Sequence, residues 1–172
     1  MDSDQIARQV TGPGGAAIAA IAHRFGPEFV DDTGALDRGR MRELAYSAPE
    51  ARTALEAIVH PLVSLHSSQQ AQAAEDAGTR VIVFDVPLLV ESGRWVQRLD
   101  TVIVIDCPPA LQIQRVMSRS GLNRSTVEAI LAAQSPRNIR RASADIVVHN
   151  GDNCTLADLH KMAEQVATRL GL

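Results

Sequence analysis

Three short apolar runs constrain the fold of this chain of 172 residues more than any other feature. They occupy residues 81–86, 101–106 and 146–149, and the first two are almost unbroken runs of β-branched or apolar side chains. Runs of this kind are typical of parallel strands that helices cover on both faces. Because helical patterns fill the segments around the runs, the sequence predicts an α/β fold with a parallel sheet.

Capping residues, prolines and glycines predict where the helices begin and end. Ser47 and Glu50 have the spacing of a capping box, which would begin a helix over residues 51–59. Pro61 should end that helix and begin another, which runs to Gly78. Further helices are predicted at residues 16–25, after a glycine-rich turn at 12–15, and at residues 158–170.

The composition excludes several classes of protein. The net charge of −3 argues against a nucleic-acid surface, and no apolar stretch reaches the ~20 residues of a membrane span. The N-terminus shows no secretion signal, and Cys107 and Cys154 lack the spacing of a metal or redox site. We therefore expect a single domain in a reducing cytoplasm, with no metal site and no membrane or nucleic-acid partner. The oligomeric state is not indicated.

Arginines are concentrated in residues 110–141, where Glu128 is the single acidic residue. Nearly all of the positive charge of the chain is guanidinium, because the only lysine is Lys161. A guanidinium group presents a planar fork of donors that matches the oxygens of a phosphate group. The segment therefore indicates either a phosphate clamp or a solvated helical face.

The arginine-rich segment is predicted to divide into helices. Gly121 should end a first helix over residues 110–119. A capping box at Ser125 should begin a second helix over residues 126–134, and Ser135, as an N-cap before a proline, should begin a third. Arginine-bearing helices joined by a glycine turn are expected to form a mobile lid that closes over a phosphoryl donor.

Carboxylates stand where the ligands of a parallel α/β sheet gather, outside the carboxyl ends of the strands. Asp85 and Asp106 close the first two runs. We expect Asp106 to cap the following helix, and Asp85, which a proline turn follows, to be functional. Asp2 and Asp4 would share one face if residues 1–4 end a strand. One of this pair would then accept a proton from a substrate hydroxyl or position a metal ion, although acidic residues near a terminus are usually only solvated.

Taken in order, the motifs of the chain resemble those of dephospho-CoA kinase over essentially all 172 residues. They are Asp2-Ser-Asp4-Gln-Ile-Ala-Arg8, Leu55-Glu-Ala-Ile-Val-His60-Pro61, Asp85-Val-Pro87-Leu-Leu-Val-Glu91, the lid from Gln114-Arg115 through Gln134 to Arg137-Asn-Ile-Arg140, Ala144-Asp145 and Asn150-Gly151. Each motif is modest, but their shared order is specific. The resemblance implies a P-loop kinase-like parallel sheet with helices on both faces, a helical substrate-binding subdomain at residues 9–78 and a helical lid at residues 110–141.

The resemblance also implies an activity and a role for each matching residue. The activity is the ATP-dependent phosphorylation of the ribose 3′-hydroxyl of dephospho-CoA, with Mg²⁺, to give coenzyme A and ADP. The base would be Asp4 in the first place and Asp2 in the second, and Arg115 would stabilise the transition state. The lid partners of ATP would be Arg119, Arg137 and Arg140, and the substrate side of the site would include Arg8, His60 and Asp85.

The chain departs from the family at its N-terminus. The family begins with a strand, a phosphate-binding loop Gly-x-x-x-x-Gly-Lys-Ser/Thr and a helix before the Asp-x-Asp pair, whereas this chain begins at that pair. The glycines of residues 12–15 are no substitute, because no lysine follows them. The first, central strand is thus absent, and we expect residues 81–86 and 101–106 to lack a neighbour and to expose apolar surface.

Several explanations of this departure stay open. We expect the sequence to be a shortened copy of an active kinase, for example through a start codon assigned too late, and to be inactive in this form. One alternative is a natural truncation that binds nucleotide or coenzyme A without catalysis. Another is a kinase of the same architecture that acts on a nucleoside monophosphate or a small alcohol.

Overall fold

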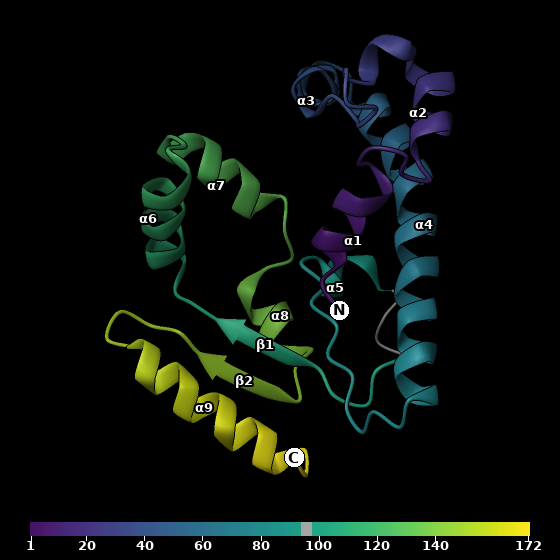
Figure 1. Ribbon diagram of the computed structural model, residues 1–172. Coiled ribbons are helices and arrows are strands. Elements are labelled where there is room, and N and C mark those ends of the chain that lie inside the picture. Colours follow the sequence, from purple (N-terminus) through teal and green to yellow (C-terminus); the bar gives the residue numbers. More distant parts are fainter. Residues whose placement is uncertain (94–97) are drawn as a thin grey trace. The chain divides into compact units, whose positions relative to one another are not determined.

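The computed structural model describes residues 1–93 and 98–172 and shows an α/β protein with a parallel sheet (Figure 1). The chain divides into two compact units, Met1–Pro87 and Leu88–Leu172. The first unit is mainly helical, and the second contains the sheet. The expected fold class is confirmed, whereas the assignment of one domain with a substrate subdomain at 9–78 and a lid at 110–141 stays a prediction.

The first unit is built from packed helices, with bounds α1 Ser3–Val10, α2 Ile18–Phe25, the 3₁₀ helix η1 Pro27–Phe29, α3 Arg38–Ser47 and α4 Pro49–Asp76. Helices α1, α2 and α3 each contact α4 (Figure 1). The core is a buried apolar cluster, against which residues of α4 pack: Ala17, Ile21, Leu36 and Met41. The helix predicted at residues 16–25 is α2, which begins two positions later.

The longest helix, α4, runs through Pro61, which was predicted to end one helix and begin another. A proline inside a helix removes one backbone donor and costs about 3 kcal/mol. The neighbouring apolar residues Ile58, Val59 and Leu62 pack against the buried cluster of the unit. Most helical stability in proteins comes from such packing, so the prediction of two helices is wrong for a tertiary reason.

The capping box predicted at Ser47 and Glu50 is also wrong. Ser47 is the last residue of α3, and its hydroxyl donates to the carbonyls of Glu43 and Leu44 at 3.1 Å each. Helix α4 begins at Pro49 without a side-chain cap. A proline at the first helical position has no N–H to satisfy, so one of the groups that a cap would serve is already missing.

The N-terminal residues begin a helix and do not end a strand. Asp2 is the N-cap of α1, and its carboxylate accepts a hydrogen bond from the N–H of Gln5 at 2.9 Å. Asp4 lies in the first turn of α1, where a negative charge interacts favourably with the helix dipole. The condition under which Asp2 and Asp4 would share one face of a strand is therefore not met, and Asp2 instead serves as an N-cap, a role that aspartate favours.

Residues 81–86 do not form the predicted strand. A single parallel bridge joins Asp2 to Asp85. The N–H of Asp85 donates to the carbonyl of Met1 at 2.8 Å, and the N–H of Ser3 donates to the carbonyl of Asp85 at 3.1 Å. Because the chain turns into α1 at Ser3, the pairing stops before a ladder of several residues can form.

The second unit contains the elements α5 Leu89–Ser92, β1 Ile103–Asp106, α6 Pro109–Ser120, α7 Arg124–Ala132, α8 Arg137–Ala142, β2 Ile146–His149 and α9 Leu156–Arg169. Strands β1 and β2 are parallel, in a register that runs from Ile103 opposite Ile146 to Asp106 opposite His149. The carboxylate of Asp145 accepts the N–H of Val102 at 2.8 Å and so fixes the start of the pair. Both strands were predicted, β2 at its observed bounds.

Two helices of the second unit, α7 and α8, have N-cap residues other than those predicted. Helix α7 is capped by Asn123, whose side-chain oxygen accepts the N–H of Thr126 at 2.9 Å, and not by Ser125. The N-cap of α8 is Pro136, one residue after the predicted Ser135. Gly121 ends α6 with a φ of 65°, as expected. Asparagine is about as good an N-cap as serine, so Asn123 can take the role that was predicted for Ser125.

Apolar side chains are exposed where the sequence predicted a missing neighbour. The exposed fractions are 64% for Val83, 38% for Ile103 and 58% for Ile105. Within residues 1–93 and 98–172, β1 pairs with β2 and with no other strand. In the same part of the chain, no helix is both long enough and apolar enough to span a bilayer.

Candidate functional site

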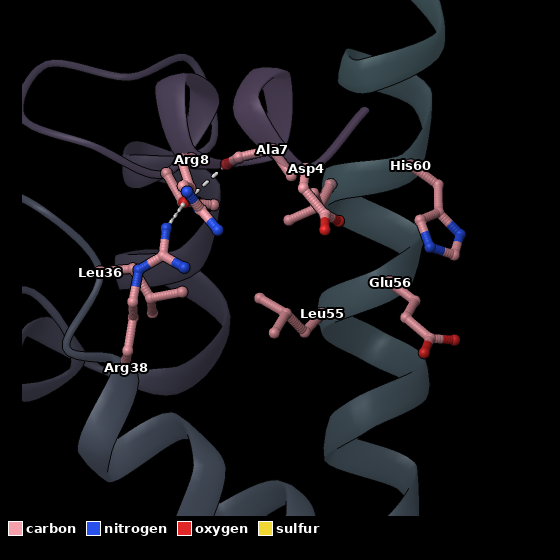
Figure 2. Close-up of a pocket in the computed structure, with 10 residues that line it drawn as sticks. Asp4, Ala7, Arg8, Leu36, Arg38, Leu55, Glu56 and His60 are labelled. Atoms are coloured by element: carbon pink, nitrogen blue, oxygen red, sulfur yellow. Dashed lines mark hydrogen bonds between the residues drawn. The ribbon is translucent and has the colours of Figure 1, made fainter. Parts of the chain in front are cut away.

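The first unit contains a pocket of about 370 Å³ between α1, the start of α3 and α4 (Figure 2). Three of the predicted site residues line it: Asp4, Arg8 and His60. The lining is completed by Ala7, Thr11, Leu36, Arg38, Leu55, Glu56 and Val59. The fold therefore brings residues of the first eight positions and residues about fifty positions later to the same pocket.

Helix α1 presents Asp4 and Arg8 to this pocket because the two residues are four positions apart and lie on one face. The opposite face of α1 carries Ile6 and Val10, which are each 2% exposed. Among the described residues the carboxylate of Asp4 has no hydrogen-bond or ion-pair partner, whereas that of Asp2 is engaged as the cap of α1. Asp4 is thus the member of the acidic pair that is available to a ligand.

Sequence reasoning missed Arg38 and Thr11. The guanidinium group of Arg38 donates to the hydroxyl oxygen of Thr11 at 3.0 Å, and that hydroxyl donates to the carbonyl of Ala7 at 2.7 Å. Thr11 is only 5% exposed, so the hydroxyl is held in one place. No motif marked these residues in the sequence, because they meet only through the chain reversal between α1 and α3.

Helix α4 supplies the other wall of the pocket. Figure 2 shows Leu55 pointing toward the space that Arg8 and Arg38 face, whereas Glu56 and His60 lie at its far edge. The carboxylate of Glu56 accepts a hydrogen bond from Arg52 at 2.8 Å and is thereby paired. The wall nearest the arginines is therefore apolar.

Asp85 lies next to the start of α1 through its backbone bridge to Asp2, but it does not line this pocket. Its side chain is exposed. In the part of the chain that the structure describes, no group of three or more His, Cys, Asp or Glu side chains could hold a metal ion.

In the second unit, Asp106 lies at the carboxyl end of β1 and binds two arginines of α8. Arg137 donates to both of its carboxylate oxygens, at 2.7 and 2.6 Å, and Arg141 approaches to 3.9 Å. The prediction that Asp106 caps the next helix is wrong, because the N-cap of α6 is Pro108 and has no side-chain bond. The hydrogen bonds from Arg137 lower the pKa of Asp106, although burial opposes the shift.

Arg115 and Arg119 of α6 differ in their surroundings. Arg115 donates to the carbonyl and side-chain oxygens of Asn150 at 3.2 and 2.9 Å and to the carbonyl of Gly151 at 3.1 Å. Arg119 is exposed and has no hydrogen-bond or ion-pair partner among the described residues. Both line a second pocket, of about 450 Å³, together with Leu111, Gln114, Ser118 and Asp152.

Glu91 connects α5 to the start of α8. Its carboxylate accepts the N–H of Ser135 at 2.7 Å. Burial raises the pKa of Glu91, but the hydrogen bonds from Ser135 and the charge of Arg140 outweigh it, so the pKa lies below its ordinary value. The buried Nε of Arg140 has no hydrogen-bond partner within the described residues. Glu91 therefore stabilises the end of the arginine-rich segment.

The predicted site residues form two groups, one in each unit. Asp4, Arg8 and His60 line the pocket of the first unit, whereas Asp2 and Asp85 are not among its lining residues and are joined to each other by a backbone bridge. The second group consists of Arg115 and Arg119 at one pocket and Arg137 and Arg140 on α8. Their assigned roles stay predictions.

Comparisons with known proteins agree with one family. A family model described as dephospho-CoA kinase matches residues 1–155. A dephospho-CoA kinase of Albidiferax ferrireducens is 50% identical over 172 residues, which are 100% of this chain and 81% of the relative. A dephospho-CoA kinase of Bordetella pertussis is 50% identical over 158 residues, which are 92% of this chain and 72% of the relative.

Solved structures resemble the fold over nearly the whole chain. A crystal structure of a Thermus thermophilus protein matches with a TM-score of 0.74 and 32% identity, and covers 99% of this chain and 83% of that one. A dephospho-CoA kinase from Campylobacter jejuni matches with a TM-score of 0.71 and 23% identity, with the same coverage of 99% and 83%. The second likeness concerns the fold alone.

Proposed function

Because the chain belongs to the dephospho-CoA kinase family, we propose that it serves the transfer of the γ-phosphoryl group of ATP to the ribose 3′-hydroxyl of dephospho-CoA. The products are coenzyme A and ADP, and the step completes coenzyme A synthesis. The observation that carries this proposal is the family match over residues 1–155, within which Asp4 and Arg8 face one pocket. The free cysteines Cys107 and Cys154 are compatible with work in a reducing cytoplasm.

Asp4 is the residue that we propose as the general base. A base must reach the proton of the attacking hydroxyl with a carboxylate that is not already engaged. Asp4 lines the pocket and has no described partner, whereas Asp2 caps α1. The pocket of the first unit therefore holds the ribose of dephospho-CoA, with its 3′-hydroxyl next to Asp4.

Two arginines of α6 are candidates for stabilising the charge that develops on the transferring phosphoryl group. Arg115 was predicted for this role from the resemblance, but its guanidinium group already donates to Asn150 and Gly151. Arg119 is one helical turn further along and free of described partners. We therefore assign phosphate contact to Arg119 and assign to Arg115 the positioning of the loop at residues 150–151.

Arg137 and Arg140 contact ATP in the predicted lid. In the structure Arg137 forms a bidentate pair with Asp106, so it must exchange that carboxylate for a phosphate group when ATP binds. Arg140 needs no such exchange, because its Nε has no partner within the described residues. Mg²⁺ enters with ATP, since it is commonly held by substrate phosphates and only one or two carboxylates.

The 172 residues do not contain every group that the reaction needs. Their only lysine is Lys161, in α9, and no segment has the form Gly-x-x-x-x-Gly-Lys-Ser/Thr. Such a loop cradles the phosphates with backbone N–H groups and places a lysine on the β- and γ-phosphates. We therefore expect the 172 residues alone to bind dephospho-CoA without phosphorylating it.

A hybrid protein tests the proposed activity. In it a strand and a phosphate-binding loop of the form Gly-x-x-x-x-Gly-Lys-Ser/Thr are joined to Met1. The hybrid should phosphorylate dephospho-CoA in preference to AMP and to pantothenate when each is supplied with MgATP and the products are separated by liquid chromatography. Preference for AMP or for a small alcohol would instead support a kinase of the same architecture with another substrate. Tight dephospho-CoA binding without turnover would support the non-catalytic alternative.

A further inference from the structure

The pocket of the first unit contains two arginines that form no ion pair with any carboxylate of the described residues. Arg8 and Arg38 both line it, and Figure 2 shows both side chains directed into the space between α1 and α3. Neither forms an ion pair among residues 1–93 and 98–172. Asp4 lines the same pocket but is not within ion-pair distance of either one. Two unpaired guanidinium groups in one pocket are a match for an anion with several oxygens.

Arg38 is held in position before any ligand arrives. Its guanidinium group donates to Thr11 at 3.0 Å, and Thr11 is fixed by its own hydrogen bond to the carbonyl of Ala7 at 2.7 Å. The two residues are 27 positions apart in the sequence, so the contact depends on the tertiary fold of the unit. The contact lowers the entropy that Arg38 must lose on binding, which is how preorganisation raises affinity.

The arrangement along α1 corresponds to the arrangement of groups on the substrate. Asp4 and Arg8 are separated by one helical turn, a rise of about 6 Å. On dephospho-CoA the 3′-hydroxyl and the 5′-diphosphate are attached to the same ribose, a few bonds apart. The apolar side chains of Leu55 and Leu36 border the same space and offer no competing charge.

We propose that Arg8 and Arg38 form the binding site for the 5′-diphosphate of dephospho-CoA, and that Thr11 positions Arg38 for this contact. The proposal rests on the proposed function, because it takes the ribose 3′-hydroxyl to lie at Asp4. With the diphosphate bound at Arg8 and Arg38, the ribose is held with its hydroxyl toward the base. The site distinguishes a substrate that carries a 5′-phosphate from a nucleoside that lacks one.

Isothermal titration calorimetry of the 172-residue chain tests this site with two ligands, dephospho-CoA and adenosine. Arg8→Ala and Arg38→Ala should each weaken dephospho-CoA binding about 10- to 100-fold, the range for a charged hydrogen bond, and leave adenosine binding unchanged. Thr11→Val should weaken dephospho-CoA binding less, by about 3- to 10-fold, because it removes only the positioning contact. Arg42→Ala is the matched control, because Arg42 is an exposed arginine of α3 outside the pocket and should change neither affinity.

Arg8 makes no side-chain hydrogen bond within the described residues, so Arg8→Ala should leave the fold intact. Weaker binding by this variant can therefore be attributed to the lost contact with the ligand and not to misfolding. If Arg8→Ala and Arg38→Ala both bind dephospho-CoA as the unmodified chain does, this inference is overturned while the proposed function stands. Equal weakening of adenosine and dephospho-CoA would also overturn it. If the unmodified chain binds inorganic pyrophosphate through Arg8 and Arg38 but does not bind dephospho-CoA, the anion site stands and the proposed substrate fails.

Discussion

At the scale of single residues, identical side chains in one helix have different tasks. Arg115 and Arg119 are separated by one turn of α6, yet among the described residues only Arg115 is bound to protein oxygens. The sequence marks both as members of an arginine-rich segment and gives no reason to separate them. The difference arises from the loop after β2, which folds back onto α6 at Asn150 and Gly151. Contact with that loop therefore decides which arginine remains free for phosphate.

Substitution of each arginine by alanine in the hybrid should separate the two tasks. Arg119→Ala should lower kcat by about 10³-fold, as the loss of a phosphate-stabilising arginine can, with little change in KM for ATP. It should leave the thermal midpoint unchanged. Arg115→Ala should lower the midpoint by about 5 °C or more, because several charge-assisted hydrogen bonds are lost. An unchanged midpoint together with a collapsed kcat in Arg115→Ala would return the transition-state role to Arg115.

The acidic pair makes a second residue-scale prediction. Asp4→Asn in the hybrid should abolish transfer and keep dephospho-CoA binding measurable by calorimetry, because a base acts on the proton of the hydroxyl. Asp2→Asn should retain activity, because asparagine is as good an N-cap as aspartate. Asp2→Ala should lower the free energy of unfolding by about 1 kcal/mol through the lost cap. An active Asp4→Asn variant beside an inactive Asp2→Asn variant would reverse the assignment.

The pair of Asp106 and Arg137 should make stability depend on pH. The pKa of Asp106 is lowered in the folded protein, so its contribution is present above the unfolded value of about 3.9 and is lost as the pH falls toward the folded value. Arg137→Ala should lower the free energy of unfolding at pH 7, because it removes two hydrogen bonds to the buried carboxylate of Asp106, and this loss should shrink as the pH falls below about 4.

Urea unfolding at several pH values measures this effect. Arg124→Ala is the matched control, because it breaks an exposed pair with Glu128 and should cost less than ~1 kcal/mol. A cost of Arg137→Ala that stays constant from pH 7 to pH 2.5 would show that the pair stabilises the protein through packing and not through the charge of Asp106.

At the scale of elements, the sequence predicted what local pattern controls and failed where distant contacts decide. Strand β2 was predicted at its observed bounds. Its run of β-branched residues has a neighbouring strand, β1, with which it pairs in parallel over its whole length. Residues 81–86 have an equally strong pattern but form only a single backbone bridge within the described chain, between Asp85 and Asp2, and so no ladder. Pro61 signalled a helix end that packing of α4 overrides.

The candidate site shows the same division. The resemblance identified Asp4 and Arg8, and the structure places both at one pocket. Thr11 and Arg38 could not be identified, because their contact spans 27 positions and depends on how α3 folds back toward α1. The pairing of Asp106 with Arg137 was missed for the same reason, since the two are 31 positions apart.

Helix α4 provides a test at this scale. Pro61→Ala should restore the N–H that bonds to the carbonyl of Ala57 and raise the free energy of unfolding by about 1–3 kcal/mol. Chemical denaturation with circular dichroism as the probe measures the change, with the exposed helix position Gln69→Ala as a control that should have little effect. A lower stability of Pro61→Ala would mean that α4 needs the proline to fit its neighbours.

At the scale of the whole molecule, exposed apolar residues of β1 and of residues 81–86 predict low stability. Ile103 and Ile105 of β1 are 38% and 58% exposed, and Val83 is 64% exposed. We expect the free energy of unfolding of the 172-residue chain to lie below the ~5–15 kcal/mol of ordinary domains. MgATP should not shift its thermal midpoint, whereas a ligand at 100 times its Kd would add ~2.7 kcal/mol. A clear shift with MgATP would show that residues not identified here hold the phosphates.

Phosphoryl transfer to the 3′-hydroxyl of dephospho-CoA is the central activity proposed for these residues. The most direct measurement incubates the 172-residue chain and the hybrid, side by side, with dephospho-CoA and γ-labelled MgATP, and determines the amount and the position of label in the product. We predict label at the ribose 3′-oxygen with the hybrid and none above background with the 172-residue chain. Comparable labelling by both proteins would contradict the need for a phosphate-binding loop, and label at any other position would contradict the proposed function.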